Sequence, residues 1–530
     1  MNIGKARVRQ MNIKQAKNEI KNTVRAYLLK DEAGDYAIPE IRQRPILMIG
    51  PPGIGKTQIM EQIARECKIG LVAYTITHHT RQSAVGLPFI REEEFEGQSY
   101  SVTEYTMSEI IASVYRSIRD KGLKEGILFI DEINCVSETL APTMLQFLQC
   151  KTFGNQKIPR GWLIVAAGNP PEYNKSVRDF DMVTLDRVRR IDIEADFGVW
   201  KEYAKSVEVN SAIISYLQLR PQNFYRIEAD VDGMQFVTAR GWEDLSSLLK
   251  VYDELGVNVD EAVIGEYLQH EDVAKDVSAY LDLYKKYQDD YGIEQILLGN
   301  TASHVYARIC KALFDERLSV VNLIISALNV YFKEVGILKH IADKWYEFLK
   351  EFRLRLEDTD EKPEKLYSGL VHGLRDEIQS EKKRGFLLKE EIAVFEQLYN
   401  QVRTVMSDFE EEQDTENDTE EGTGKEAVFE QARIPFDKFT EELERKEEEM
   451  LFKLNNAFDF AEHAFQNGSE MVLFVTELTM GSDSAAFLAE HECERYLKYN
   501  KELMIGTRKA ELLAELKEDE IRGSEHMREF

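Results

Sequence analysis

Cysteine is scarce in this sequence of 530 residues. The five cysteines form no CxxC pair, which argues against a disulfide framework or a zinc ribbon and favours a reducing compartment. Runs of about 18 uninterrupted apolar residues are also missing, so we expect no membrane-spanning helix. The N-terminal residues are polar and of mixed charge, unlike a signal peptide. We therefore expect a cytoplasmic protein.

Basic residues are few relative to acidic ones. Lysine and arginine number 67 against 95 aspartates and glutamates, which gives a formal net charge of −28. Duplex binding needs clustered positive charge, so nucleic acid is not the expected partner, although a local basic patch stays open. Hydrophobic residues make up 43 % of the chain, which is ordinary globular usage and allows a sizeable core.

The first 190 or so residues alternate between two patterns. Strand-like apolar runs lie at Pro45–Ile49, Leu71–Ile76, Ile127–Ile130 and Leu163–Ala167. Helical patterns separate them, for example at Gln58–Cys67 and Ser108–Arg119. Buried parallel strands have short continuous apolar runs, and their alternation with helices predicts a doubly wound parallel α/β sheet.

Residues Gly50–Thr57 read GPPGIGKT and match the phosphate-loop pattern G-x-x-x-x-G-K-[ST] at every fixed position. The motif follows an apolar run and opens a helix, so backbone N–H groups and the helix N-terminus face a phosphate. Lys56 would place a cation on the β- and γ-phosphates, and the Thr57 hydroxyl would bind Mg²⁺. The expected nucleotide-binding residues are Gly50, Pro51, Pro52, Gly53, Ile54, Gly55, Lys56, Thr57 and Gln58.

Two adjacent carboxylates follow the third apolar run, in the segment ILFIDEIN (Ile127–Asn134). The carboxyl ends of strands are where ligands bind in open α/β sheets. Asp131 would hold Mg²⁺ together with Thr57, and Glu132 would orient or polarise the attacking water. Taken alone, the pair is equally typical of a solvated loop; the phosphate loop upstream favours the functional interpretation.

Three further stretches carry polar candidates. Asn169 ends the run LIVAAGN and could bond the γ-phosphate or the water, although Asn also favours plain strand-ending turns. Leu185–Arg190 reads LDRVRR, which is either a solvated basic patch or a source of transition-state charge stabilisation. Arg240, in the segment TARGWE, could reach a phosphate or pair with Glu243.

These five stretches, in this order, resemble the AAA+ ATPases, most closely the MoxR-type and dynein-related branch, over roughly residues 36–300. The resemblance implies that GPPGIGKT is Walker A and that ILFIDEIN is Walker B. It further implies that Asn169 is sensor 1, Arg187 the arginine finger and Arg240 sensor 2. LDRV departs from the usual LDRF, so Arg189 and Arg190 stay open as fingers. Whether Arg240 acts on its own subunit's nucleotide or a neighbour's also stays open.

The resemblance further implies an ATP- and Mg²⁺-dependent motor that works as a homo-oligomeric ring, expected to be a hexamer. It would remodel or mature a protein client in a chaperone-like manner, with a von Willebrand factor A (VWA) domain protein as partner. Two alternatives stay open: a nucleotide-gated binding scaffold with little turnover, and a DNA-directed motor of restriction or helicase type. The segment Val85–Thr106 could form a β-hairpin insert typical of this branch, and Lys151–Gly161 a second hairpin, while each segment taken singly is more typical of a plain surface loop.

The expected fold class is α/β, a P-loop NTPase sheet with an α-helical lid and a mostly helical C-terminal region. Met471–Glu477 (MVLFVTE) has the pattern of a strand within that region. The predicted regions are an N-terminal helix (1–35), the AAA+ α/β core (36–196), the helical lid (197–300), a helical region (301–407), an acidic disordered linker (408–427) and a helical C-terminal region (428–530).

Overall fold

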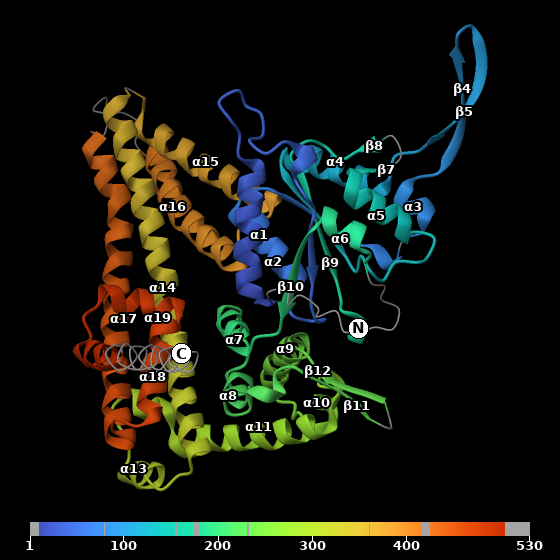
Figure 1. Cartoon of the computed structure of the whole chain (residues 1–530). Helices are drawn as coiled ribbons and strands as arrows, with labels where there is room; N and C mark the ends of the chain where they lie inside the picture. The colour runs from blue at the N-terminus through green and yellow to red at the C-terminus, as the bar shows by residue number, and fades with distance from the viewer. Residues whose placement is uncertain are drawn as a thin grey trace, which may run out of the picture.

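The computed structural model describes residues 10–78, 80–153, 156–173, 180–230, 233–359, 361–415 and 425–503. A parallel sheet flanked by helices forms the N-terminal part, and long helices form the C-terminal part (Figure 1). The α/β fold class with a helical lid and a helical C-terminal region is therefore confirmed.

The central sheet has six strands in the order β1-β10-β2-β9-β6-β3, and all neighbouring pairs are parallel. Its strands are β1 (Gln10–Asn12), β2 (Ile46–Ile49), β3 (Gly70–Thr75), β6 (Gly126–Asp131), β9 (Trp162–Gly168) and β10 (Arg189–Glu194). The four predicted strands are confirmed. Strands β1 and β10 were not predicted, because both are rich in polar and charged residues.

Alternate side chains of each strand enter two separate hydrophobic cores. Met48 and Phe129 pack on one face of the sheet under α1 and α2, whereas Leu47 and Leu128 pack on the other under α4 and α5. These helices are α1 (Ile13–Leu28), α2 (Lys56–Glu66), α4 (Glu109–Lys121) and α5 (Ala141–Cys150). Both faces of the sheet are thus covered, as continuous apolar strands require.

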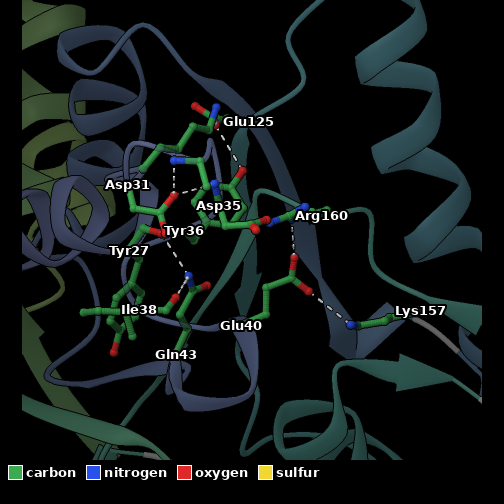
Figure 2. A network of polar contacts seen from close by, with 12 residues as sticks. Tyr27, Asp31, Asp35, Tyr36, Ile38, Glu40, Gln43, Glu125, Lys157 and Arg160 are labelled. Carbon is green, nitrogen blue, oxygen red and sulfur yellow. Dashed lines mark hydrogen bonds and ion pairs between the residues drawn. The ribbon is translucent and has the colours of Figure 1, made fainter.

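The segment between α1 and β2 is fixed by polar contacts at the amino-terminal end of the sheet, away from the predicted site (Figure 2). Glu40 accepts from Lys157 over 3.1 Å and lies 3.3 Å from Arg160 Nε. Tyr36 donates to Glu125 over 3.0 Å, and burial together with this carboxylate raises the pKa of Tyr36 to about 12. This network anchors the chain before it enters β2.

Two hairpins extend from the α/β core, as their sequences suggested. The first pairs β4 (Pro88–Phe95) with β5 (Gln98–Tyr105) and projects well away from the body (Figure 1). Its side chains are mostly exposed, and Ile90 is 75 % exposed. The second is short and pairs β7 (Thr152–Phe153) with β8 (Gln156–Lys157). Two small helices complete the core, α3 (Arg81–Val85) and α6 (Met182–Arg187).

Helices after β10 form the lid. They are α7 (Phe197–Ser206), α8 (Ser211–Leu219), α9 (Ala239–Leu255), α10 (Glu261–Tyr267), α11 (Glu271–Tyr291) and α12 (Ile293–Leu297). An unpredicted hairpin, β11 (Arg226–Asp230) with β12 (Gly233–Val237), precedes α9. Short 3₁₀ turns are η1 (Glu40–Arg42), η2 (Ile76–His78), η3 (Pro171–Tyr173) and η4 (Pro221–Asn223).

The C-terminal part is a bundle around two long helices, α14 and α17, which lie side by side (Figure 1). Its helices are α13 (Ser303–Ile309), α14 (Phe314–Asp358), α15 (Pro363–Arg384), α16 (Lys389–Thr415), α17 (Lys425–Phe465), α18 (Ser469–Met480) and α19 (Ser482–Glu490). One hydrophobic core contains Trp200 and Trp242 of the lid as well as Phe458 and Phe474 of the bundle. Lid and bundle are therefore packed as one unit.

Among the described residues, α14 is the single helix that is long and apolar enough by composition to cross a membrane; α18 and α19 would pass only as one bent span. Phe332 and Val335 of α14 are buried in the shared core, and Phe352 is buried in a second core with α15 and α17. This packing makes α14 a core helix rather than a membrane span.

Two expectations for the C-terminal part differ from the structure. Met471–Glu477 was predicted as a strand and is wrong, because these residues lie in α18. Met471, Val475 and Leu478 are spaced along one buried helical face, and a short apolar run cannot separate a buried helix from a strand. Of the predicted linker, residues 408–415 belong to α16 and α17 begins at Lys425, while 416–424 lie outside the described residues.

Candidate nucleotide-binding site

The loop between β2 and α2 has the conformation that a phosphate cradle needs. Gly53 and Gly55 have φ values of +73° and +88°, a region that residues with a Cβ rarely adopt. A Cβ on Gly50 would lie 2.9 Å from the carbonyl oxygen of Ile193, so this close approach to β10 also requires glycine. The sequence GPPGIGKT is therefore matched to a tight backbone turn that ends at the N-terminus of α2.

Lys56 is buried beneath this loop, with 8 % of the residue exposed. Its ammonium donates to the carbonyls of Gly50 and Pro51 over 2.8 Å each, and to Asn169 Oδ1 over 2.9 Å. Burial, which disfavours the charged form, lowers the pKa of Lys56 to about 8, and nearby Asp131 opposes this shift. A bound phosphate would supply the anion that this desolvated cation lacks.

Thr57 and Asp131 meet directly at the end of the loop. The Thr57 hydroxyl donates to Asp131 Oδ2 over 3.0 Å. Both groups offer oxygen, the ligand that Mg²⁺ prefers. Within the described part of the chain, no group of three or more His, Cys, Asp and Glu side chains could hold a metal ion. The pair therefore suits an ion that takes its other ligands from water and from phosphate.

Glu132 follows β6 in a left-handed conformation with φ +56°, which is uncommon for a residue with a side chain. Its carboxylate accepts a hydrogen bond from Thr77 Oγ1 over 2.8 Å, from the turn that follows β3. Two different strands thus fix the backbone and the carboxylate of Glu132. Strain of this kind is commonly found at functional sites.

Asn169 follows β9 and is held by Asn134, a residue to which the sequence analysis gave no role. The Asn134 amide donates to the Asn169 carbonyl over 2.8 Å and accepts from the Asn169 backbone N–H over 3.2 Å. A Cβ on Gly168 would lie 2.5 Å from Asn134 Oδ1, so glycine makes room for this clamp. A buried polar residue three positions after Asp131 is the signal that could have identified it.

The predicted phosphate-site residues line one cavity of about 290 Å³. Its walls come from the loop, from β6, from β9 and from the first turns of α9. The lining residues are Pro52, Gly53, Gly55, Lys56, Thr57, Gln58, Asp131, Glu132, Asn169, Arg240, Glu243 and Asp244. Arg240 lies at the phosphate loop of its own chain, close enough for its charge to lower the pKa of Lys56. Gly50 and Pro51 contribute through the carbonyls that bind Lys56.

A second, mostly apolar cavity of about 280 Å³ adjoins the first and was not predicted. It lies between α1, α2 and α7, and its lining includes Ile54, Ile59, Val199, Trp200 and Tyr203. The two cavities share Gly55, Gln58 and Glu243. An aromatic and aliphatic recess next to a phosphate loop suits a planar base. Its residues come from several separated segments, from Ile13 to Glu243, so no local motif indicates it.

The three arginines after α6 have different surroundings. Arg187 ends α6, is exposed and contacts Gln149 Oε1. Arg189 donates to Thr23 Oγ1 over 2.6 Å and pairs with Glu19 of α1, and Arg190 bonds Asp192 over 2.7 Å. None of the three lines the phosphate cavity of its own chain. Arg187 differs from the other two in forming no salt bridge with another described residue.

Comparison with protein-family models agrees with this geometry. Residues 46–187 match the model described as ATPase family associated with various cellular activities (AAA). This segment is similar to an AAA domain. No curated protein matches the chain. The matched range begins with β2 and ends at Arg187, so it contains Walker A, Walker B and Asn169. Arg240, and helix α7 that lines the apolar cavity, lie beyond it. The similarity to this family indicates nucleotide binding and hydrolysis.

Proposed function

We propose that the protein is an Mg²⁺-dependent, ATP-hydrolysing motor of MoxR type. The observation that carries the proposal is the convergence of four separate sequence stretches on one cavity, where Lys56, Asp131 and Arg240 are all present. The adjoining apolar recess has room for the base. A chain that bound only free phosphate would not need this recess.

Each residue of the cavity has a task that its position supports. The loop N–H groups and Lys56 bind the β- and γ-phosphates, and Arg240 adds a second cation from the lid. Thr57 and Asp131 hold Mg²⁺, which when bound neutralises charge on the phosphate oxygens. Glu132 polarises the attacking water, and Asn169 orients it or the γ-phosphate. Arg187, exposed and outside its own cavity, serves a neighbouring subunit as arginine finger.

The proposed biological role is remodelling or maturation of a protein client by a homo-oligomeric ring, with a VWA-domain protein as partner. Motif order and the two hairpins support the MoxR type. The β4–β5 hairpin projects from the body with exposed Phe89, Ile90 and Phe95, a surface suited to contact with a client (Figure 1). Phosphate loops bind GTP as well as ATP, so the choice of ATP rests on the AAA domain.

The test is phosphate release with Mg·ATP by the wild type and by Glu132→Gln. We expect turnover in the wild type, and loss of at least 100-fold with nucleotide binding retained in the variant, because only the water-activating carboxylate changes. Lys56→Ala provides the control that loses binding. The wild type and Glu132→Gln could instead both release negligible phosphate, even after a VWA-domain partner is added. That result would support a nucleotide-gated scaffold.

A further inference from the structure

Glu243 occupies the boundary between the phosphate cavity and the apolar cavity. It is one of three residues that line both, with Gly55 and Gln58. In a nucleoside triphosphate the ribose joins the base to the phosphates. A nucleotide with its phosphates over the Gly53–Thr57 loop and its base in the apolar recess must therefore place its ribose at this boundary.

The carboxylate of Glu243 has acceptor capacity left for a ligand. Trp200 Nε1 donates to Oε1 over 3.2 Å, and Gln58 Nε2 and Tyr203 OH lie 3.5 Å from Oε2. The last two contacts are at the long limit of hydrogen bonding, and a carboxylate offers about four acceptor positions. Ribose hydroxyls are donors, and carboxylates bind them in other dinucleotide and nucleotide sites.

The backbone of Glu243 is also well fixed. Thr238 caps α9 by accepting from the Gly241 N–H over 3.3 Å. The neighbouring Trp242 is fully buried and donates to the Phe224 carbonyl over 3.0 Å. The Glu243 side chain therefore extends toward the boundary between the two cavities from a well-packed helix rather than from a loop.

We propose that Glu243 binds the ribose hydroxyls of the nucleotide and makes the site select ribonucleotides over deoxyribonucleotides. This inference rests on the proposed function and adds a specificity residue to it. Glu243 is a binding residue in this role, separate from the cations that hold the phosphates. Its hydrogen bonds with Gln58 of α2 and with Trp200 and Tyr203 of α7 would shorten when a nucleotide is bound.

The experiment measures dissociation constants of Mg·ATP, Mg·2′-deoxy-ATP and Mg·3′-deoxy-ATP by calorimetry, in a Glu132→Gln parent that does not consume them. We expect the parent to prefer ATP over at least one deoxynucleotide by about tenfold or more, as a hydrogen bond to a charged group provides. Glu243→Ala should bring this ratio to within about twofold of one. Glu254→Ala, an equal charge change on the exposed end of α9, should leave the ratio unchanged.

A purely structural role of Glu243 predicts a different pattern. If Glu243 only clamps α7 to α9, Glu243→Ala weakens ATP and the deoxynucleotides equally, the ratio stays as in the parent, and the proposal is overturned. Trp200→Phe removes the shortest hydrogen bond to Glu243 and keeps the carboxylate, so affinity should fall while the ratio is preserved. A ratio of one in the parent would also refute the proposal, while a parent that binds no nucleotide at all would refute the proposed function itself.

Discussion

Glu477 of α18 lies 2.8 Å from the ammonium of Lys201 on α7, and only 2 % of the Glu477 side chain is exposed. Lys205, one turn further along α7, pairs with the other carboxylate oxygen, and Gln218 donates to the carboxylate over 3.1 Å. Helix α7 also lines the apolar cavity, through Trp200 and Tyr203. The C-terminal bundle is thus tied by a buried charge to the helix that borders the nucleotide site.

Replacement of Glu477 by leucine should destabilise this junction strongly. Lys201 and Lys205 would remain as largely buried cations without their anion, a situation that typically costs about 3–5 kcal/mol. The midpoint of urea unfolding, followed by tryptophan fluorescence, should fall accordingly. The matched control is the triple variant Glu477→Leu, Lys201→Met and Lys205→Met, which should recover most of the loss. Equal destabilisation of the single and triple variants would assign the effect to packing.

Nucleotide binding should take up a proton near pH 8 through Lys56. Burial lowers the pKa of this lysine to about 8 in the free protein, and a bound phosphate favours the charged form and raises it again. Binding at pH 8 should therefore take up a substantial fraction of one proton, and binding near pH 6.5 almost none. Affinity should decline as the pH rises above 8, because the free site then holds neutral lysine.

Calorimetry in buffers of different ionisation enthalpy measures this uptake directly. Lys151 is the control, since burial lowers its pKa to about 8 as well, but it lies at the Glu40 carbonyl outside both cavities. Lys151→Met should leave the proton uptake unchanged. An uptake that is the same at pH 6.5 and pH 8 would contradict the role of Lys56.

Two inactive variants should restore activity when they are mixed. Arg187→Ala should keep nucleotide binding and lose about 100-fold or more in turnover, because an arginine finger stabilises transition-state charge. Glu132→Gln is inactive in its own site but retains Arg187. In mixed rings, an Arg187→Ala subunit keeps its own Glu132 and receives Arg187 from a neighbouring Glu132→Gln subunit. Phosphate release should therefore reappear at the site of the Arg187→Ala subunit. Arg190→Ala is the control and should stay active, and failure of complementation would place the finger elsewhere.

Removal of the β4–β5 hairpin should leave the fold and the basal ATPase intact. Its side chains are largely exposed, and its base is closed by the Leu87 and Thr106 backbone, which pair over 2.9 Å. Replacement of residues 89–104 by a short glycine-serine turn should shift Tm by no more than about 2 °C, because little apolar area leaves the core. A large loss of Tm or basal turnover would show that the hairpin supports the core.

The sequence contained enough information for the sheet's centre and the phosphate loop. Leu47 and Phe129 lie in continuous apolar runs, and the glycines of GPPGIGKT report a backbone constraint that is local in the chain. Strand β10 was missed because it reads RRIDIE, where only Ile191 and Ile193 face a core. Its other four residues are charged, so the strand lacks the continuous apolar run by which the four other strands were predicted.

The remainder of the site depends on contacts that are distant in sequence. Asn134 acts through Asn169, 35 residues away, and the apolar cavity joins Ile59 to Trp200 across a whole domain. Helix α18 was mistaken for a strand because its apolar run is short and contains β-branched residues, and such a run does not distinguish a strand from a helix with one buried face. Patterns that repeat along one segment could be predicted from the sequence, whereas contacts between distant segments could not.

Only Val188 separates Arg187 from β10, and β10 lies against β2, with Arg189 in register with Ile46 and Asp192 with Ile49. The strand that borders a subunit's own phosphate loop therefore leads directly to the arginine proposed to complete the next subunit's site. In such a ring each sheet would take part in two reactions at once. The connection between two neighbouring sites would then run through a pair of hydrogen-bonded strands rather than through a flexible connector.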